Sequence, residues 1–397
     1  MISSIMQSDV TRKRPDVLFV ITSLSVGGSE RQLMLLASAL AKEGMIIAVY
    51  GLNDGVIRAD LERAGIEVII APSAGIMSVP LAALRLLGFM LTRRPCIVHF
   101  FLPAAYLIGA PVAVLARIRV RIMSRRSLNN YQRNDFVRLL ERLWHRTMDA
   151  VIGNSRRVVG QLSEEGVPRE RLGLIYNGIG ISSVQSDPAI RNRTRALLGL
   201  APGALTMTIV ANLIPYKGHR DLIDALALAV PGMPAGWRLL VVGRDDGIGA
   251  RLRAQAAHLN LNANIIFLGS RDDVPAILAA SDIGVLCSHE EGFSNAVLEG
   301  MAAGLPMAVT DVGGNAEAVV DGETGFVVPP RDSNALAEVI TRLASDASLR
   351  ERLGTAGRRR VAQRFGLAAF IGSHRSLYAA LLAGRRPCDV PALAVQP

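Results

Sequence analysis

The sequence predicts an α/β protein built from two domains with parallel sheets. Brief apolar runs of strand length alternate with helix-length segments from residue 17 to residue 328, which is typical of parallel strands joined by helices. A chain of 397 residues exceeds what one hydrophobic core usually supports, so two domains of ordinary size are expected. Half of the residues are hydrophobic and 20% are charged, which fits strands buried beneath helices.

The expected elements are short apolar runs bounded by glycine and polar residues, and segments with apolar residues at helical spacing. In the first half, strands are expected at 17–21, 48–51, 68–71, 97–101, 121–124 and 150–153, and helices at 31–42, 57–64, 80–91 and 136–146. In the second half, strands are expected at 206–211, 239–243, 265–269, 282–287, 307–310 and 326–328. Helices are expected at 190–198, 220–229, 249–259, 296–303, from Glu317 to about 321, over 334–362 and over 365–383.

The charge balance favours anionic partners. Lys and Arg total 44 against 34 Asp and Glu, a net charge of +10, which suits nucleotides, phosphoprenyl lipids or an anionic membrane surface. Only 5% of the residues are aromatic and no nucleic-acid-binding motif is present, which argues against nucleic acid as a partner. Cys96, Cys287 and Cys388 are odd in number and far apart, so neither a disulfide framework nor a zinc site is expected.

The chain is expected to work in the cytoplasm. Residues 1–14 have no continuous apolar core of signal-peptide type and are predicted to be a disordered lead-in. No apolar run reaches the roughly 18 residues that a membrane-spanning helix needs, and the nearest candidate, residues 79–91, is interrupted by Arg85. Peripheral attachment to the inner face of the cell membrane stays open.

Two places in the first half are candidates for ligand contact. Gly27 and Gly28 stand between the first strand and the first helix, where residues without side chains let a ligand approach the backbone. The pair is not a G-x-G-x-x-G fingerprint, which weakens a dinucleotide interpretation, and a simple chain reversal is the alternative. His99 lies in the strand 97–101, where a packed core histidine is the alternative to a functional one.

Basic residues in the first half suggest contact with anions. Arg125 and Arg126 follow the strand 121–124 and either meet an anionic acceptor or form a solvated basic loop. The segment 136–146 is predicted to be a basic amphipathic helix. It either lies against anionic lipid head groups, together with Arg85, Arg93 and Arg94, or covers its own apolar face with arginine stems.

The most informative stretch is residues 289–306. After the buried strand 282–287, Ser294 or Asn295 is placed to cap a helix, and Gly304 is a stop signal. Unpaired backbone N–H groups at such a helix start attract an anion, and these would belong to Phe293, Ser294 and Asn295.

Two glutamates border this helix start. Glu291 lies in the preceding loop, at the carboxyl edge of the sheet, and Glu299 lies one turn inside the helix, where it can accept hydrogen bonds from hydroxyl groups. The pattern therefore indicates a phosphorylated ligand that is rich in hydroxyls. The alternative is that both glutamates are solvated charges at a helix end.

Lys217 is a second candidate for the same ligand. It follows the strand 206–211 at its carboxyl end, where an ammonium group can neutralise a diphosphate as a point charge. An exposed loop lysine is the alternative.

Glu291 and Glu299, with seven residues between them, and the later run from Gly313 to Glu317 resemble the signature of retaining glycosyltransferases of family 4. The resemblance runs from about residue 17 to about residue 365 and is most specific in the second half. It implies the GT-B fold, in which two Rossmann-like domains face each other across a cleft and a C-terminal helix crosses back to the first domain.

Applied to this chain, the resemblance implies definite domain boundaries. The disordered lead-in 1–14 would be followed by an acceptor-side domain at 15–181, a linker at 182–204 and a nucleotide-sugar-binding domain at 205–365. The crossing helix would cover 366–385, and the proline-rich remainder, 386–397, is predicted to be a disordered tail.

The resemblance also assigns roles to particular residues. Glu291 would hold sugar hydroxyls and Glu299 the ribose, while His99 would lie near the transferred sugar, so that Glu291, Lys217 and His99 are the expected catalytic residues. The expected donor-binding residues are Gly27, Gly28, Asn212, Lys217, Arg271, Glu291, Gly292, Phe293, Ser294, Asn295 and Glu299. Asn212 stands where the family commonly has an arginine of the phosphate clamp, and its neutral amide can still donate hydrogen bonds. Arg125–Arg126–Ser127 stand where many members show a histidine, so the role of that histidine does not carry over.

The implied function is a metal-independent, retaining hexosyltransferase. It would move sugar from a UDP- or GDP-sugar co-substrate, with no other cofactor, to a lipid-linked or polysaccharide acceptor in cell-surface glycan synthesis. A sugar-nucleotide epimerase of the same fold and a non-catalytic sugar-nucleotide-binding protein are the alternatives. No metal-ligand cluster and no Ser/His/Asp nucleophile motif is present in the sequence.

Overall fold

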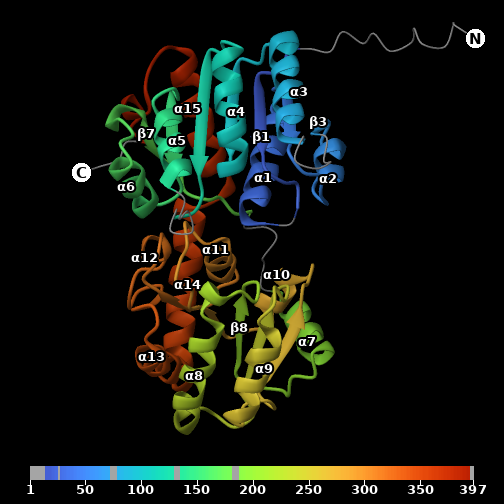
Figure 1. The fold of residues 1–397 in the computed structure, drawn as a ribbon. Coiled ribbons are helices and arrows are strands. Elements are labelled where there is room, and N and C mark those ends of the chain that lie inside the picture. Colours follow the sequence, from blue (N-terminus) through green and yellow to red (C-terminus); the bar gives the residue numbers. More distant parts are fainter. Residues whose placement is uncertain (1–13, 26, 72–77, 129–134, 181–186, 394–397) are drawn as a thin grey trace, which may run out of the picture. The chain divides into compact units, whose positions relative to one another are not determined.

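The computed structural model describes residues 14–25, 27–71, 78–128, 135–180 and 187–393, and it divides the chain into two compact units. Unit 1 comprises the chain up to Asn154, Val158–Ile175 and the chain from Phe370 onward, and unit 2 comprises Ser155–Arg157 and Tyr176–Ala369. Each unit contains one parallel sheet covered by helices (Figure 1).

The sheet of unit 1 has the strand order β3-β2-β1-β4-β5-β6-β7. Its strands are β1 (Val17–Ile21), β2 (Ile47–Gly51), β3 (Glu67–Ile70), β4 (Ile97–Phe101), β5 (Val120–Arg125), β6 (Ala150–Gly153) and β7 (Leu172–Leu174). The helices are α1 (Gly28–Lys42), α2 (Arg58–Arg63), α3 (Ser78–Arg93), α4 (Pro103–Leu115), α5 (Asp135–His145), α6 (Arg156–Glu164) and α15 (Leu367–Leu382), whose first residues lie in unit 2.

The sheet of unit 2 has the strand order β10-β9-β8-β11-β12-β13. Its strands are β8 (Thr206–Val210), β9 (Arg238–Val242), β10 (Ile265–Gly269), β11 (Ile283–Leu286), β12 (Met307–Thr310) and β13 (Gly325–Val328). The helices are α7 (Pro188–Leu197), α8 (His219–Ala229), α9 (Gly249–His258), α10 (Val274–Ala279), α11 (Asn295–Ala302), α12 (Asn315–Ala318), α13 (Ser333–Ser345) and α14 (Ala347–Arg364). The short 3-10 helix η3 (Pro215–Lys217) precedes α8.

Both sheets confirm the predicted Rossmann-like architecture. In each, the first strand lies inside the sheet and the chain moves to one side before it crosses to the other, so β1 pairs with β2 and β4, and β8 pairs with β9 and β11. Such a reversal of strand order leaves a crevice at the carboxyl ends of the two central strands, where open α/β sheets bind ligands. In unit 2 this place is beyond the ends of β8 and β11.

The predicted strands all form, but several helices were not anticipated. The helix α4 has apolar residues on most of its faces and contains Pro111, so it shows no amphipathic period, and α6 and α10 are short. The predicted single helix 334–362 is two helices, because Asp346 leaves helical geometry and accepts a hydrogen bond from the Leu349 amide at 2.8 Å.

The prediction of a disordered tail at 386–397 is wrong for the part of the tail that the structure describes. Residues 387–389 form a 3-10 helix, and Leu393 is fully buried and accepts a hydrogen bond from the Leu174 amide at 3.2 Å. The segment is therefore part of the fold of unit 1, although its proline-rich composition suggested disorder. The predicted lead-in, apart from Arg14, and residues 394–397 lie outside the described residues.

The predicted linker is ordered from Asp187 onward, while residues 181–186 lie outside the described residues. Asp187 caps α7 by accepting a hydrogen bond from the Ala189 amide at 2.8 Å, and α7 packs against α10 within unit 2. Contacts change from unit 1 to unit 2 between Ile175 and Tyr176, before the expected linker begins.

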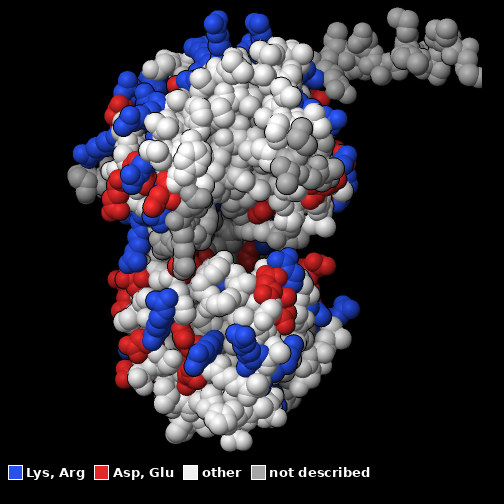
Figure 2. All heavy atoms as spheres, in the orientation of Figure 1, with Lys and Arg blue, Asp and Glu red and all other residues white. Residues whose placement is uncertain are grey.

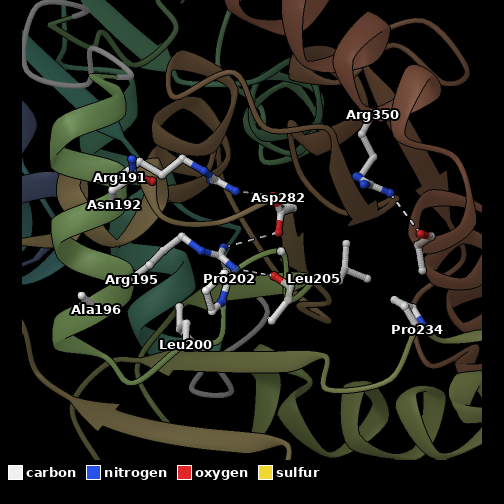
Figure 3. A pocket seen from close by; sticks show the side chains of 13 residues that line it. Arg191, Asn192, Arg195, Ala196, Leu200, Pro202, Leu205, Pro234, Asp282 and Arg350 are labelled. Atoms are coloured by element: carbon white, nitrogen blue, oxygen red, sulfur yellow. Dashed lines mark hydrogen bonds and ion pairs between the residues drawn. The ribbon is translucent and has the colours of Figure 1, made fainter.

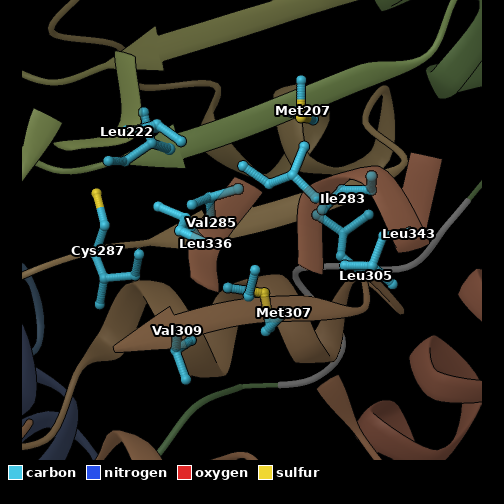
Figure 4. Close-up of a cluster of buried hydrophobic side chains, with 14 of the residues drawn as sticks. Met207, Leu222, Ile283, Val285, Cys287, Leu305, Met307, Val309, Leu336 and Leu343 are labelled. Carbon is cyan, nitrogen blue, oxygen red and sulfur yellow. The ribbon is translucent and has the colours of Figure 1, made fainter. Parts of the chain in front are cut away.

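The core of unit 2 fills the space between its sheet and the surrounding helices. Figure 4 shows Met207, Ile283 and Val285 of β8 and β11 beside Met307 and Val309 of β12, all of them buried. Strands that are apolar on both faces need helices on both faces, which is the arrangement that a parallel sheet requires.

The helices α11 and α14 are in close contact. The α14 helix approaches the end of α11 at Gly354, where a Cβ atom would lie 1.9 Å from the carbonyl oxygen of Gly304. Gly304 itself has φ of +82° and ends the helix as predicted. The two helices can approach this closely because Gly354 has no side chain.

Gly354→Ala is expected to destabilise the protein although alanine favours helices. The added methyl group meets a backbone oxygen that cannot move aside, and overpacking of this kind costs roughly 1–3 kcal/mol. Gly372→Ala is the matched control, because Gly372 lies inside α15 with no atom within 4 Å of its Cβ position. The control should gain about 0.5–1 kcal/mol from helix propensity.

Thermal melts followed by circular dichroism measure both effects. A higher melting temperature for Gly354→Ala than for Gly372→Ala would contradict the packing account.

Candidate functional site

An ion pair joins the two central strands of unit 2 just beyond their carboxyl ends. Lys217, at the end of η3 after β8, places its Nζ atom 2.6 Å from Oε1 of Glu291, in the loop after β11. The Ser288 hydroxyl donates to the same carboxylate oxygen at 2.7 Å. The structure therefore brings together the two residues on which the predicted site depends, at the place where the strand order reverses.

The environment keeps the lysine charged. Burial alone would lower the pKa of Lys217, but the Glu291 carboxylate, together with Tyr216 and Cys287, raises the pKa above its ordinary value. The ammonium group also lies 5.3 Å from the centre of the Tyr216 ring. A fixed positive charge is thus held at the carboxyl edge of the sheet at neutral pH.

The position of Lys217 depends on Gly218. This residue has φ of +72°, and a Cβ atom on it would lie 1.9 Å from the carbonyl oxygen of Cys287. The thiol of Cys287 donates to the carbonyl of Gly218 at 3.1 Å, and the His289 amide donates to the carbonyl of Tyr216 at 2.7 Å. The end of β11 and the segment that carries Lys217 are therefore in direct backbone contact.

The start of α11 lies next to Glu291 and confirms the predicted cap. The Ser294 hydroxyl accepts a hydrogen bond from the Val297 amide at 3.4 Å, and the helix begins at Asn295. A helix start carries backbone amides that the helix cannot pair and a partial positive charge, both of which favour an anion. Glu299 is buried one turn inside the helix.

The loop between Glu291 and α11 is braced by residues that the sequence interpretation did not single out. The Asn177 amide donates to the carbonyl of Phe293 at 2.8 Å and to Oδ1 of Asn295 at 2.7 Å. The Phe293 ring packs against Tyr176 and Phe365, with ring centres 5.0 Å and 5.2 Å away. Phe293 thus anchors the loop by its side chain, while its backbone forms part of the turn.

Gly313 and Gly314 lie directly against the loop that carries Glu291. A Cβ atom on Gly313 would lie 2.2 Å from the carbonyl oxygen of Glu291, and one on Gly314 would lie 2.2 Å from the Phe293 ring. The Gly314 amide donates to the carbonyl of Gly292 at 2.7 Å. The glycine turn therefore packs against the loop that carries Glu291 and supports it.

Two further predicted donor contacts lie at neighbouring strand ends of unit 2. Asn212 follows β8 and accepts a hydrogen bond from the Arg244 amide at 3.2 Å through its side-chain oxygen. Arg271 follows β10 and forms two hydrogen bonds with the carboxylate of Asp273, at 2.8 Å and 2.7 Å. Their roles toward a ligand stay predictions.

The remaining predicted residues belong to unit 1. Gly27 precedes α1 in extended geometry, and a Cβ atom on it would overlap the Glu30 carboxylate. His99 is fully buried, and its two ring nitrogens lie 2.8 Å from the Tyr378 hydroxyl and 2.7 Å from the Ser124 hydroxyl. Burial holds the pKa of His99 well below its ordinary value, so the imidazole has the surroundings of a packed core residue.

The prediction of a solvated basic loop at Arg125 and Arg126 is wrong. Arg125 is only 3% exposed and forms ion pairs with Glu141 at 3.4 Å and Glu165 at 2.6 Å. Arg126 is buried beside the rings of Phe101 and Phe370, and burial lowers its pKa to about 9. Neither side chain is a solvated surface charge.

Unit 2 also has an arginine-lined pocket, of about 620 Å³, at the opposite edge of its sheet (Figure 3). It lies at the amino ends of β8 and β11, where Arg191 donates to the carbonyls of Ala279 and Ser281 and pairs with Asp282 at 2.6 Å. These carbonyls follow the end of α10, so the arginine satisfies backbone oxygens that the helix leaves unpaired. The Arg191 guanidinium thus joins α7 to the segment between α10 and β11.

The described residues hold no group of three or more His, Cys, Asp and Glu side chains that could bind a metal ion. Within the same described ranges, no helix has the length and hydrophobicity to cross a membrane.

Comparisons with known proteins find family models and relatives that match this chain. Residues 26–182 match the family described as Glycosyltransferase Family 4, and residues 191–360 match Glycosyl transferases group 1. The capsular polysaccharide biosynthesis glycosyltransferase CapM of Staphylococcus aureus is 27% identical, with 68% of this chain and 73% of that protein covered. The putative glycosyltransferase EpsD of Bacillus subtilis is 31% identical over 52% of this chain and 54% of its own length.

Solved structures show the same fold. HepE of Anabaena, solved in complex with UDP, matches with a TM-score of 0.82 and 25% identity over 91% of this chain and 98% of that one. A glycosyltransferase from Rickettsia africae matches with a TM-score of 0.82 and 20% identity over 93% of this chain and 99% of its own.

Gly218→Ala is expected to separate the two halves of the ion pair. Gly236→Ala is the matched control, because Gly236 has φ of +74° but no atom within 4 Å of its Cβ position. Both variants meet the backbone strain of the left-handed region, about 1–2 kcal/mol, and only Gly218→Ala also meets the Cys287 carbonyl. Gly218→Ala should therefore melt clearly below Gly236→Ala, and equal melting temperatures would refute the close contact.

Proposed function

Because this chain belongs to the glycosyltransferases of family 4, with the GT-B fold of two Rossmann-like domains, we propose that it is a retaining hexosyltransferase that uses a UDP- or GDP-sugar. The observation that carries this proposal is the Lys217–Glu291 pair beside the start of α11. A cation and a helix start suit a diphosphate, and a carboxylate suits sugar hydroxyls. The same edge of the sheet thus offers groups for both parts of a nucleotide sugar.

The pair leaves bonding capacity for a ligand on both sides. An ammonium group has three N–H donors, and Glu291 takes one of them. Among the described residues, the donors to Glu291 all reach Oε1, so Oε2 is available to accept hydrogen bonds from sugar hydroxyls. Lys217 would contact the diphosphate while Glu291 orients the sugar.

A cation beside a carboxylate suits the charges that develop during sugar transfer. Breaking the bond between the anomeric carbon and the diphosphate builds positive charge on the sugar and negative charge on the leaving group. Lys217 and the amides of α11 would stabilise the leaving diphosphate without a metal ion, and Glu291 would lie on the sugar side. Retention would follow from attack on the same face, with a donor phosphate oxygen taking the proton of the acceptor.

The acceptor is proposed to be a lipid-linked or polysaccharide glycan of the cell surface, and the chain is proposed to act in the cytoplasm. Support comes from CapM, a relative named for capsular polysaccharide biosynthesis. HepE has been solved with UDP and glucose and with UDP-glucose, which supports a UDP-sugar as the first donor to test.

Glu291→Gln should lower kcat/KM for sugar transfer by about 10²–10³-fold, because it removes the negative charge while keeping the size of the side chain. Lys217→Ala should lower it by a similar factor, mainly through kcat, since the leaving diphosphate loses its cation. Glu43→Gln is the control, because Glu43 forms an exposed ion pair with Arg375 in unit 1.

Nucleotide released from radiolabelled donors measures these rates. Unchanged turnover in both site variants would reject the site. Interconversion of the donor in the absence of an acceptor would indicate an epimerase, and donor binding without any turnover would indicate a binding protein.

A thermal-shift panel of UDP- and GDP-sugars should identify the donor. A ligand that binds only the folded state stabilises it by about 2.7 kcal/mol at a concentration 100 times its dissociation constant. One nucleotide series should raise the melting temperature, and Lys217→Ala should reduce that shift more than Glu43→Gln does. An absence of any shift with either series would contradict the donor assignment.

A further inference from the structure

The arginine-lined pocket of unit 2 continues into a second pocket along α14. The second pocket has a volume of about 700 Å³ and shares Arg191, Asp282 and Arg350 with the first, of about 620 Å³. Both volumes are in the range of cavities that hold small molecules. The described residues that line them all lie in unit 2. We call the two pockets together the arginine site.

The arginine site has an excess of positive charge. Asp282 and Glu351 are the acidic residues among its described lining, whereas the basic residues are Arg191, Arg195, Arg350, Arg358 and Arg359. Asp282 is already shared, since its carboxylate lies 2.6 Å from Arg191 and 3.7 Å from Arg195. Figure 2 shows Lys and Arg scattered over the face of unit 2 that it displays, together with acidic residues. The arginine site differs from such a mixed surface because its own carboxylates do not balance its cations, which favours an anionic ligand.

Two of the arginines are held in place by backbone carbonyls. Arg191 and Arg195 lie one turn apart on α7 and reach into the first pocket from one side, with Arg350 on the other side (Figure 3). Arg195 donates to the carbonyls of Ala204 and Ala280 at 2.6 Å and 2.9 Å. Such neutral partners fix a guanidinium group without cancelling its charge, so little conformational entropy is lost when an anion binds.

Arg350 offers free hydrogen-bond donors. Its Nη1 group donates to the carbonyls of Leu343 and Ala344 at 2.7 Å and 3.0 Å. A guanidinium group has five N–H donors, and no described residue accepts from those on Nε and Nη2 of Arg350. The Nε–Nη2 edge has the geometry that binds two oxygens of a phosphate or a carboxylate at once. The side chain is thus anchored on one edge and open to an oxyanion on the other.

The other lining residues narrow the class of ligand. Among the described residues, the lining has no aromatic ring on which a nucleotide base could stack. Asn192, Glu351 and Thr355 offer polar side chains to hydroxyl groups. Several arginines attract a doubly charged phosphate more strongly than a singly charged carboxylate. The lining therefore suits a phosphate group without a nucleoside.

We propose that the arginine site binds the phosphate group of a small molecule that carries no nucleoside. Arg350 would hold two phosphate oxygens through its Nε–Nη2 edge, and Arg359, exposed on the same helix, would add a second cation. The arginine site lies at the amino edge of the sheet of unit 2, whereas Lys217 and Glu291 lie at its carboxyl edge. The proposal therefore goes beyond sugar transfer and does not depend on it.

Isothermal titration calorimetry of the full chain with glycerol 3-phosphate and with inorganic phosphate tests this proposal. Both should bind, added salt should weaken the binding, and uncharged glycerol should not bind. Tighter binding of glycerol 3-phosphate would assign the site to a phosphate monoester, and tighter binding of inorganic phosphate would assign it to the free ion. Lys217→Ala should leave both affinities unchanged, because Lys217 lies at the other edge of the sheet.

Variants of α14 identify the residues that bind. Arg350→Lys keeps the charge but loses the planar donor edge, so it should weaken binding of glycerol 3-phosphate by about tenfold. Arg359→Gln should weaken it by roughly threefold, because it removes one exposed charge. Arg352→Lys and Arg352→Gln are the matched controls, since Arg352 is exposed on the same helix and is not among the residues that line either pocket.

Melting curves establish that each variant is folded, and Arg359→Gln keeps the test decisive if Arg350→Lys unfolds. Three results would overturn the proposal. The first is the absence of binding by both phosphate compounds at millimolar concentration. The second is an equal effect of the Arg352 variants and of the folded variants at Arg350 and Arg359. The third is loss of binding in Lys217→Ala or displacement by a nucleoside diphosphate, because the phosphate would then occupy the carboxyl edge of the sheet.

Discussion

The carboxyl edge of the second sheet depends on one ion pair. Lys217 and Glu291 come from segments that follow β8 and β11, and they meet at 2.6 Å because Gly218 lets those segments touch along their backbones. A largely buried charge without a partner is costly, so each side chain favours the position of the other. The pair thereby keeps a cation and a carboxylate side by side next to the start of α11.

Much of the fold could be predicted from the sequence, because parallel strands and helix caps are encoded locally. All predicted strands form, and Ser294 caps α11 as its position before a run of good helix formers indicated. The α4 helix was missed because apolar residues on most faces erase the helical period. The predicted tail failed for a different reason, since the burial of Leu393 depends on a partner, Leu174, far away in the sequence.

The site could be predicted only in part. Glu291 and Lys217 meet beyond the carboxyl ends of strands, as their positions in the sequence indicated, whereas Ser288 and Asn177 form hydrogen bonds that only the folded loops create. Ser288 lies three residues before Glu291, a spacing that offered the one available signal. The packing of Gly313 against the Glu291 loop could not be predicted either, because the sequence of a glycine turn does not show which segment will lie against it.

The first unit shows how long-range partners reverse a local expectation. Arg125 looked like a surface charge, but it is buried in ion pairs with Glu141 of α5 and with Glu165. His99 is likewise enclosed by Tyr378, a partner 279 residues away. Local patterns indicate which helix is amphipathic, and only tertiary contacts decide which side faces water.

Hydrogen exchange measured by mass spectrometry, with and without the nucleoside diphosphate that stabilises the protein most, tests the central claim most directly. Binding at the Lys217–Glu291 pair predicts slower exchange in residues 212–219 and 288–299, with no change in residues 191–206 and 343–359, which border the arginine-lined pocket. Protection confined to the second pair of segments would contradict the account and would move the nucleotide to the opposite edge of the sheet.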